Sequence, residues 1–175
     1  MSSKLSPKDT PRRDLSHVAP NGKARMVDVS DKQVTDRTAR AEAWVTVGPQ
    51  IASMLRETGG VAKGGVLEAA RLAGIMAAKR TADLVPMCHP LQLEVVEVDA
   101  TLIEDRVRIV SRVACRAKTG VEMEAMTAAA VAAVTVYDMV KSAGKGVEIG
   151  PVRLLEKRGG KSGHWKRQEE TDAED

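Results

Sequence analysis

The segment Thr119–Lys141 (TGVEMEAMTAAAVAAVTVYDMVK) constrains the fold of this 175-residue chain more than any other part. It is long and almost wholly apolar, yet Glu122 and Glu124 stand near its start and Asp138 near its end. On a helix, residues three apart are neighbours, so Asp138 and Lys141 would lie together on one face. The segment therefore predicts a hydrophobic helix whose edge holds either a proton-handling pair or a structural ion pair.

The composition predicts one domain with a core built from small side chains. The chain has no Phe, one Tyr and two Trp, and its 43% apolar residues are mainly Ala, Val, Leu and Met. Such a core favours close helix packing or burial between subunits. The length is that of a single domain. The formal charge is +3, but five acidic residues crowd the last seven positions, so the rest of the chain is more basic and suits an anionic ligand.

Cysteine usage and hydropathy predict a cytoplasmic protein without a membrane partner. Cys88 and Cys115 lie far apart and in no paired spacing, which is typical of a reducing compartment. The N-terminus lacks the apolar core of a secretory signal. The Thr119–Lys141 run carries Glu and Asp, and no other segment approaches the roughly 20 apolar residues that cross a bilayer.

Alternation and helical spacing divide the chain into a domain at residues 21–161 between two polar tails, 1–20 and 162–175, which we expect to be disordered. The expected strands are Thr38–Val47, Leu93–Ile103, Val107–Cys115 and Val147–Leu155, and the expected helices are Pro49–Glu57, Val66–Arg80 (with a further turn at Thr81–Val85) and Thr119–Lys141. A tight turn at Glu104-Asp105 joins the second and third strands. The order strand, helix, strand, strand, helix, strand predicts an α+β protein of the ferredoxin-like (split βαβ) type, an antiparallel sheet with helices packed on one face. The alternative is a different α+β sandwich.

Two glycine-rich segments resemble phosphate loops only in part. Gly59–Gly65 lacks the Gly-Lys-Ser/Thr ending, and Gly160-Lys161-Ser162 has Leu155 where the first glycine of the motif should stand. Neither is therefore a nucleotide-hydrolase motif. Both remain either loops whose backbone N–H groups and lysines hold phosphate, or flexible loops with solvated lysines.

The run Met87-Cys88-His89-Pro90, which follows Pro86, predicts a stiff loop that fixes the direction of His89. His89 either hydrogen-bonds a ligand or serves a structural role. Zinc is disfavoured because adjacent Cys and His rarely reach one metal and no second ligand pair exists. Nothing in the sequence marks a reactive thiolate. His17 and His164 fall in the predicted tails and carry little weight.

Glu124 and Asp138 are fourteen residues apart, which places them on one side of a helix but about 21 Å from each other. They could bracket a long ligand or belong to sites completed by different subunits. Basic residues recur near the ends of predicted elements, where loops could converge on one cleft or simply be solvated: Arg37, Lys63, Lys79, Arg80, Lys157 and Lys161.

Several segments together resemble the molybdenum-cofactor biosynthesis protein C family, whose members are cyclic pyranopterin monophosphate synthases. They are Lys23–Lys32, Ala73–Leu91, Lys118–Ala128, Thr135–Lys141 and Gly150–Gly163. The resemblance covers roughly residues 17–163. It implies a ferredoxin-like subunit in a homohexamer, a trimer of dimers, with active sites at the dimer interface. It also implies a lyase that rearranges a cyclised dihydro-GTP, made by a radical enzyme, into cyclic pyranopterin monophosphate with loss of pyrophosphate.

The resemblance also assigns roles to residues. It implies no cofactor and no bound metal, apart from a divalent ion that could accompany the triphosphate. The implied catalytic residues are Asp138, Lys141, Lys63 and Lys157. The implied substrate-binding residues are Met87, Cys88, His89, Glu122, Met123, Glu124, Arg37 and Lys161. Ring opening and closure need several proton transfers, for which a carboxylate and lysine pair is suited, and the cations would stabilise departing pyrophosphate.

The chain departs from the family pattern at two glycines. The family usually reads Lys-Gly-Asp-Val where this chain has Lys63-Gly64-Gly65-Val66, and it usually has a polar residue in place of Gly144. An inactive relative is therefore one alternative. A nucleic-acid-binding module is another, but the chain has almost no aromatic side chains on which bases could stack.

Overall fold

The computed structural model describes residues 15–19, 21–57, 65–161 and 163–168. Their elements, in chain order, are β1 (Thr35–Thr46), α1 (Gly48–Glu57), α2 (Val66–Ala78), α3 (Thr81–Leu84), β2 (Val95–Ile103), β3 (Arg106–Ala117), α4 (Glu122–Val140), β4 (Glu148–Arg158) and β5 (His164–Lys166).

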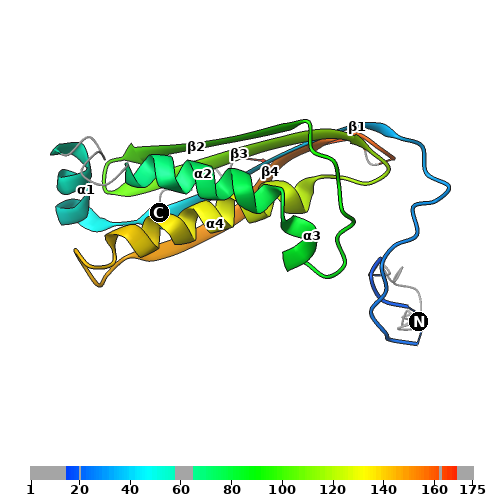
Figure 1. The fold of residues 1–175 in the computed structure, drawn as a ribbon, viewed down its shortest axis with the longest axis horizontal. Coiled ribbons are helices and arrows are strands. Elements are labelled where there is room, and N and C mark those ends of the chain that lie inside the picture. Colours follow the sequence, from blue (N-terminus) through cyan, green and yellow to red (C-terminus); the bar gives the residue numbers. More distant parts are fainter. Residues whose placement is uncertain (1–14, 20, 58–64, 162, 169–175) are drawn as a thin grey trace, which may run out of the picture.

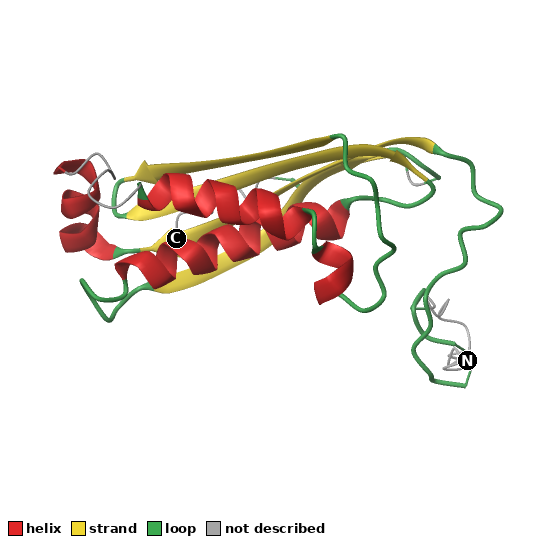
Figure 2. Cartoon of the chain, viewed as in Figure 1, coloured by secondary structure: helices red, strands yellow, loops and turns green. Residues whose placement is uncertain are grey.

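The strands of the described residues form one antiparallel sheet in the order β2-β3-β1-β4-β5. β3 separates β1 from β2, and β1 separates β3 from β4, so two split βαβ units interleave. Helices α2 and α4 lie side by side over one face of the sheet, α1 lies at one end, and α3 lies at the other (Figures 1 and 2). The predicted ferredoxin-like fold is confirmed.

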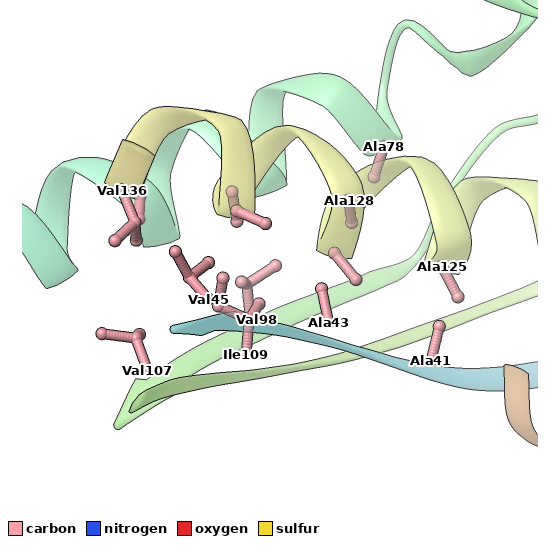
Figure 3. Close-up of a cluster of buried hydrophobic side chains, with 14 of the residues drawn as sticks. Ala41, Ala43, Val45, Ala78, Val98, Val107, Ile109, Ala125, Ala128 and Val136 are labelled. Atoms are coloured by element: carbon pink, nitrogen blue, oxygen red, sulfur yellow. The ribbon is translucent and has the colours of Figure 1, made fainter. Parts of the chain in front are cut away.

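The core lies between the sheet and the two long helices and consists of small residues. Alternate residues of β1 point toward the helices: Ala39, Ala41, Ala43 and Val45. A stripe of buried alanines and valines on α4 packs against them (Figure 3). A Cβ placed on Gly74 of α2 would stand 2.9 Å from the carbonyl oxygen of Ala128 in α4. The absence of a side chain there lets the two helix backbones approach closely, as the composition predicted.

The element bounds follow the expected ones with a few differences. β1 begins three residues earlier than predicted, because Thr35, Asp36 and Arg37 continue the pairing with β3. The helix expected at Val66–Arg80 ends at Ala78, and the following turn is the separate helix α3. The turn at Glu104-Asp105 is confirmed, and Glu104 adopts the left-handed conformation with φ 52°. β5 was not predicted: it lies in the segment assigned to the C-terminal tail and pairs with the end of β4.

The sheet face turned away from the helices is polar at its centre. The carboxylate of Glu42 in β1 is only 2% exposed and accepts hydrogen bonds from Arg108 of β3 and Arg153 of β4. The Arg106 guanidinium lies over the Trp44 ring, 4.4 Å from its centroid. This cluster ties the three central strands together on the side opposite the core.

Helix α4 is long and apolar enough to cross a bilayer by length and composition alone. In the structure, however, Ala125, Ala129, Ala132 and Val136 on one of its faces are completely buried within the domain. This is the arrangement of the core helix of a globular domain.

Residues 15–19 and 21–34, here called the N-terminal arm, precede β1 and extend beyond the end of the sheet (Figure 1). A bridge between Val18 and Ala24 closes a small hairpin, in which Gly22 has φ 78°. Positive φ is readily adopted only by glycine. Residues 15–19, which the sequence assigned to a tail, form the first limb of this hairpin.

Candidate active site

A cavity of about 410 Å³ opens at the N-terminal end of α4. Three segments line it: the N-terminal arm, the loop between α3 and β2, and the start of α4. The lining residues are Ser16, His17, Val27, Lys32, Met87, Cys88, His89, Leu91, Thr119, Gly120, Glu122, Met123 and Glu124. The structure thus brings together six residues that the resemblance assigned to substrate binding, Met87, Cys88, His89, Glu122, Met123 and Glu124.

The α3–β2 loop contributes Met87, Cys88 and His89, all half-buried. The backbone N–H of Cys88 donates to the carbonyl of Val85, which holds the loop against the end of α3. The flanking prolines restrict the backbone further. The loop therefore presents a thioether, a thiol and an imidazole to one cavity from a stiff frame.

Glu122 forms the link between this cavity and the sheet. β4 pairs Lys157 with Ala39 of β1, and the Lys157 Nζ then lies 2.9 Å from the Glu122 carboxylate. Both side chains are about a quarter to a third exposed, with 31% for Lys157 and 26% for Glu122. A predicted catalytic lysine and a predicted substrate-binding carboxylate are therefore already in contact.

Glu124 is the buried acid of the site, with 4% exposure. Burial raises the pKa of its carboxyl group; the nearby Glu122 charge adds to this rise, while a hydrogen bond from its own backbone N–H opposes it. A carboxyl group with a raised pKa keeps its proton to higher pH, so Glu124 is suited to donate a proton.

The two cysteines are poor nucleophiles in this environment. Burial raises the pKa of the Cys88 thiol, and the Glu124 charge raises it further. Burial and Glu124 act in the same direction on the pKa of Cys115. Because the thiolate is the reactive form, both thiols are kept in the unreactive state. Cys88 can contact a ligand, but the structure gives no support to a covalent role.

Arg37 does not line the cavity. Its guanidinium donates to the carbonyl oxygens of Ala117 and Lys118, at 3.3 and 3.4 Å. Gly160 packs against the same guanidinium so closely that a Cβ there would overlap it. Arg37 therefore ties the start of β1 to the β3–α4 connection and to the turn after β4. Lys161, beside that turn, is exposed.

Asp138 and Lys141 lie at the opposite end of α4 from the cavity (Figure 1). The Lys141 Nζ donates to the Asp138 carboxylate at 2.6 Å, and the two side chains are 59% and 67% exposed. The hydrogen bond from Lys141 to Asp138, together with the Asp138 charge, raises the pKa of Lys141. In the single chain this lysine therefore keeps its proton and its positive charge, so it is not poised to act as a base.

Comparison with known proteins decides the family. The model of the MoaC family matches residues 26–160, most of the chain. The chain belongs to the MoaC family. It is 54% identical over 153 residues to a cyclic pyranopterin monophosphate synthase of Streptomyces avermitilis, which covers 87% of this chain and 89% of the relative. It is 53% identical over 157 residues to the protein of the same name from Streptomyces coelicolor, with 90% and 92% covered.

The segment before α2 and the connection after α4 hold the two glycines singled out in the sequence, Gly65 and Gly144. Lys63 lies outside the described residues, whereas Gly65 immediately precedes α2. At Gly144 a Cβ would stand 3.1 Å from the Ile51 Cδ1 of α1, so a larger residue there would press on α1.

The sequence reasoning missed the contribution of the N-terminal arm. Ser16, His17, Val27 and Lys32 line the cavity, although His17 was given little weight. A signal was present, because the resemblance to the family already reached back to residue 17. Ser16 and His17 fall within residues 1–20, which were assigned to a tail for their polar, proline-containing sequence, whereas Val27 and Lys32 fall within the predicted domain but in no predicted helix or strand.

The chemistry of the cavity is that of proton transfer and anion binding. It holds a carboxyl group with a raised pKa, an imidazole, and an ion pair at its edge. Within the described part of the chain, no group of three or more His, Cys, Asp or Glu side chains is arranged to hold a metal ion.

Proposed function

We propose that the protein is a cyclic pyranopterin monophosphate synthase, a lyase of molybdenum cofactor biosynthesis. It would convert (8S)-3',8-cyclo-7,8-dihydroguanosine 5'-triphosphate into cyclic pyranopterin monophosphate and diphosphate. The observation that carries this proposal is the near-full-length identity of more than half of the residues to two synthases of that name. The cavity residues described above are consistent with it.

The cavity supplies groups that such a rearrangement needs. Opening and reclosing rings requires protons to be donated and removed at several atoms. Glu124, protonated to higher pH by its burial, is suited to donate one, and His89 lies in the same cavity. The Lys157 ammonium lies 2.9 Å from Glu122, a lining residue of the cavity, and would stabilise the negative charge of a leaving pyrophosphate there.

We further propose that each site is completed by a second copy of the chain. Asp138 and Lys141 stand on α4 about 21 Å from Glu124, too far to act in the same cavity. On the same face of α4 as Asp138, at helical spacing, Val134 and Tyr137 are 56% and 38% exposed. Leu72 and Met76 on the neighbouring helix α2 are likewise exposed, at 50% and 54%; these four residues are here called the outer helix patch.

The outer helix patch gives the pairing a physical basis. Exposed large apolar side chains gathered on adjacent helices are typical of an interface. A second copy seated on this patch would cover it and carry its own cavity toward Asp138 and Lys141. A trimer of such dimers, active in the cytoplasm without a resident cofactor, is the assembly and setting that we propose.

The direct test is turnover. The purified protein is incubated with the cyclised dihydro-GTP, released pyrophosphate is measured, and the product is oxidised to a fluorescent pterin. We expect both signals in equal amounts, and neither when GTP replaces the cyclised substrate. Consumption of the substrate without pterin, or no consumption by a folded protein, would remove the proposed activity.

A further inference from the structure

The N-terminal arm forms one wall of the cavity, and it is joined to the rest of the domain by few hydrogen bonds among the described residues. Most of its residues are exposed, including Leu15 at 73%. Its firm attachment is a hydrogen bond of 2.7 Å from the Lys118 Nζ, in the β3–α4 connection, to the Ser30 carbonyl. This anchor holds the middle of the arm beside the start of α4, where Glu122 and Glu124 reside.

A local turn holds the Asp28 carboxylate within the arm. The Asp28 carboxylate accepts hydrogen bonds from the hydroxyl and the backbone N–H of Ser30, at 2.7 and 2.9 Å. These hydrogen bonds lower the pKa of Asp28, and the charges of Lys118 and His89 lower it further. Asp28 is therefore ionised within the arm, two residues from the Ser30 carbonyl that Lys118 contacts.

The hairpin of the arm fixes one nitrogen of His17. The His17 Nδ1 lies 3.3 Å from the carbonyl oxygen of Arg25, and the Arg25 N–H donates to the His17 carbonyl at 2.9 Å. A carbonyl oxygen can only accept, so Nδ1 must carry the hydrogen. In the neutral ring Nε2 is then a bare acceptor. No described residue makes a hydrogen bond to Nε2.

His17 is exposed, so its Nε2 is open to solvent or to a ligand. Its ring lines the cavity. One nitrogen is held by the hairpin, which orients the ring, and the other is left to a ligand. Lys32, farther along the arm, lines the same cavity and adds positive charge.

We propose that His17 is a substrate-contacting residue: its Nε2 accepts a hydrogen bond from an N–H or O–H group of a nucleotide bound in the cavity, while Lys32 faces the negative charge of that nucleotide. The identity of the nucleotide, a cyclised guanosine triphosphate, rests on the proposed function. The arm thus serves as a wall of the binding site that the hairpin keeps in position.

Two variants of His17 separate the two nitrogens. In His17→Asn the amide nitrogen stands near the position of Nδ1 and can still donate to Arg25, but Nε2 is lost. In His17→Gln the amide group reaches the position of Nε2 and can accept through its oxygen, but the bond to Arg25 is lost. His164→Asn is the matched control, because His164 is exposed, contacts Glu156 and lies outside the cavity.

The readouts are kcat and KM for the cyclised dihydro-GTP and, independently, calorimetric binding of GTP as a non-reacting probe. We expect His17→Asn to raise KM and weaken GTP binding about fivefold to tenfold, the effect of one lost hydrogen bond. For His17→Gln, KM and the dissociation constant for GTP should stay within about twofold of those of the original protein, a loss well below that of a whole hydrogen bond. For His164→Asn both quantities should be unchanged.

The outcomes distinguish this inference from the proposed function. If the original protein turns over and His17→Asn has a normal KM, the His17 assignment is wrong while the function stands. The assignment is also wrong if His17→Gln is impaired as much as His17→Asn, since the hairpin bond would then be what matters. If the original protein shows no turnover, the proposed function fails, and GTP binding alone decides: weaker binding by His17→Asn supports the contact, and equal binding refutes it.

Discussion

Replacing Glu42 by Gln should measure how strongly the polar face of the sheet holds the three central strands together. The Glu42 carboxylate is 2% exposed. It accepts two hydrogen bonds from Arg108, at 3.0 and 2.8 Å, and one from Arg153 at 2.8 Å. Glutamine has nearly the same shape but no charge, and its amide group would turn two hydrogens toward a guanidinium. The substitution therefore removes the charge and leaves the packing.

The size of the loss follows from these contacts. Hydrogen bonds to a charged group contribute about 1.5–3 kcal/mol each, and breaking a buried pair costs about 3–5 kcal/mol. Here the two arginines are 40% and 37% exposed, so water can replace part of what they lose. We therefore expect Glu42→Gln to lower the free energy of unfolding by about 2–4 kcal/mol at pH 7.

The effect should depend on pH with a definite sign. Burial alone would raise the pKa of Glu42, but hydrogen bonds from Arg153 and Arg108 outweigh it and lower the pKa below the usual 4.5. A carboxylate whose pKa is lowered by folding stabilises the fold at pH values above its pKa in the unfolded chain. This stabilisation is lost as the pH falls through the pKa of the folded protein. The difference between the two proteins should be constant above about pH 5.5 and shrink below about pH 4.5.

Urea unfolding at several pH values tests both parts of this expectation. Glu97→Gln is the control, because Glu97 pairs with Arg112 at 3.1 Å on the same sheet but is 64% exposed. Exposed pairs contribute about 0–1 kcal/mol. The reasoning is refuted if Glu42→Gln costs no more than Glu97→Gln, or if the gap between Glu42→Gln and the original protein widens in acid.

Two further substitutions test other features. Glu124→Gln should raise the melting temperature at pH 7.5 but not at pH 4, because burial raises the pKa of Glu124 and its ionised form destabilises the fold as the pH rises through that pKa. Scanning calorimetry at both pH values measures this, and a lower melting temperature of the variant at pH 7.5 would contradict it. Glu104→Gly should raise the free energy of unfolding by about 0.5–1 kcal/mol, because Glu104 has φ 52° and glycine tolerates that conformation; a measured loss in urea would show that the turn is not strained.

The sequence predicted the fold well because its core elements carry strong patterns. The alternation in β1 and β3 and the apolar length of α4 each indicate one structure, and their order along the chain fits one topology. β5 escaped prediction because His164, Trp165 and Lys166 show no such pattern; they pair with the end of β4 through the backbone, and the His164 ring contacts the Glu156 carboxylate.

The candidate site could be predicted only in part. The spacing of fourteen residues already separated Glu124 from Asp138, and the structure places them at opposite ends of α4. The partners of Arg37 could not be foreseen, because the carbonyl oxygens that it contacts belong to a turn far away in the sequence. His17 was missed because it falls within residues 1–20, whose polar, proline-containing sequence indicated a tail, and because its hairpin is held by backbone hydrogen bonds that no side-chain pattern reveals.

Subunit mixing can decide whether the cavity of one chain works with Asp138 of another chain. Two inactive variants, Asp138→Asn and His89→Ala, are co-expressed with different tags, and the mixed assemblies are purified through both tags. In a trimer of dimers assembled at random, purification through both tags removes only the few particles built from a single variant, so about one quarter of the sites join an intact cavity to an intact Asp138. We predict that the co-expressed protein regains about that fraction of the original turnover. Mixed assemblies no more active than either variant alone would contradict a site shared between chains.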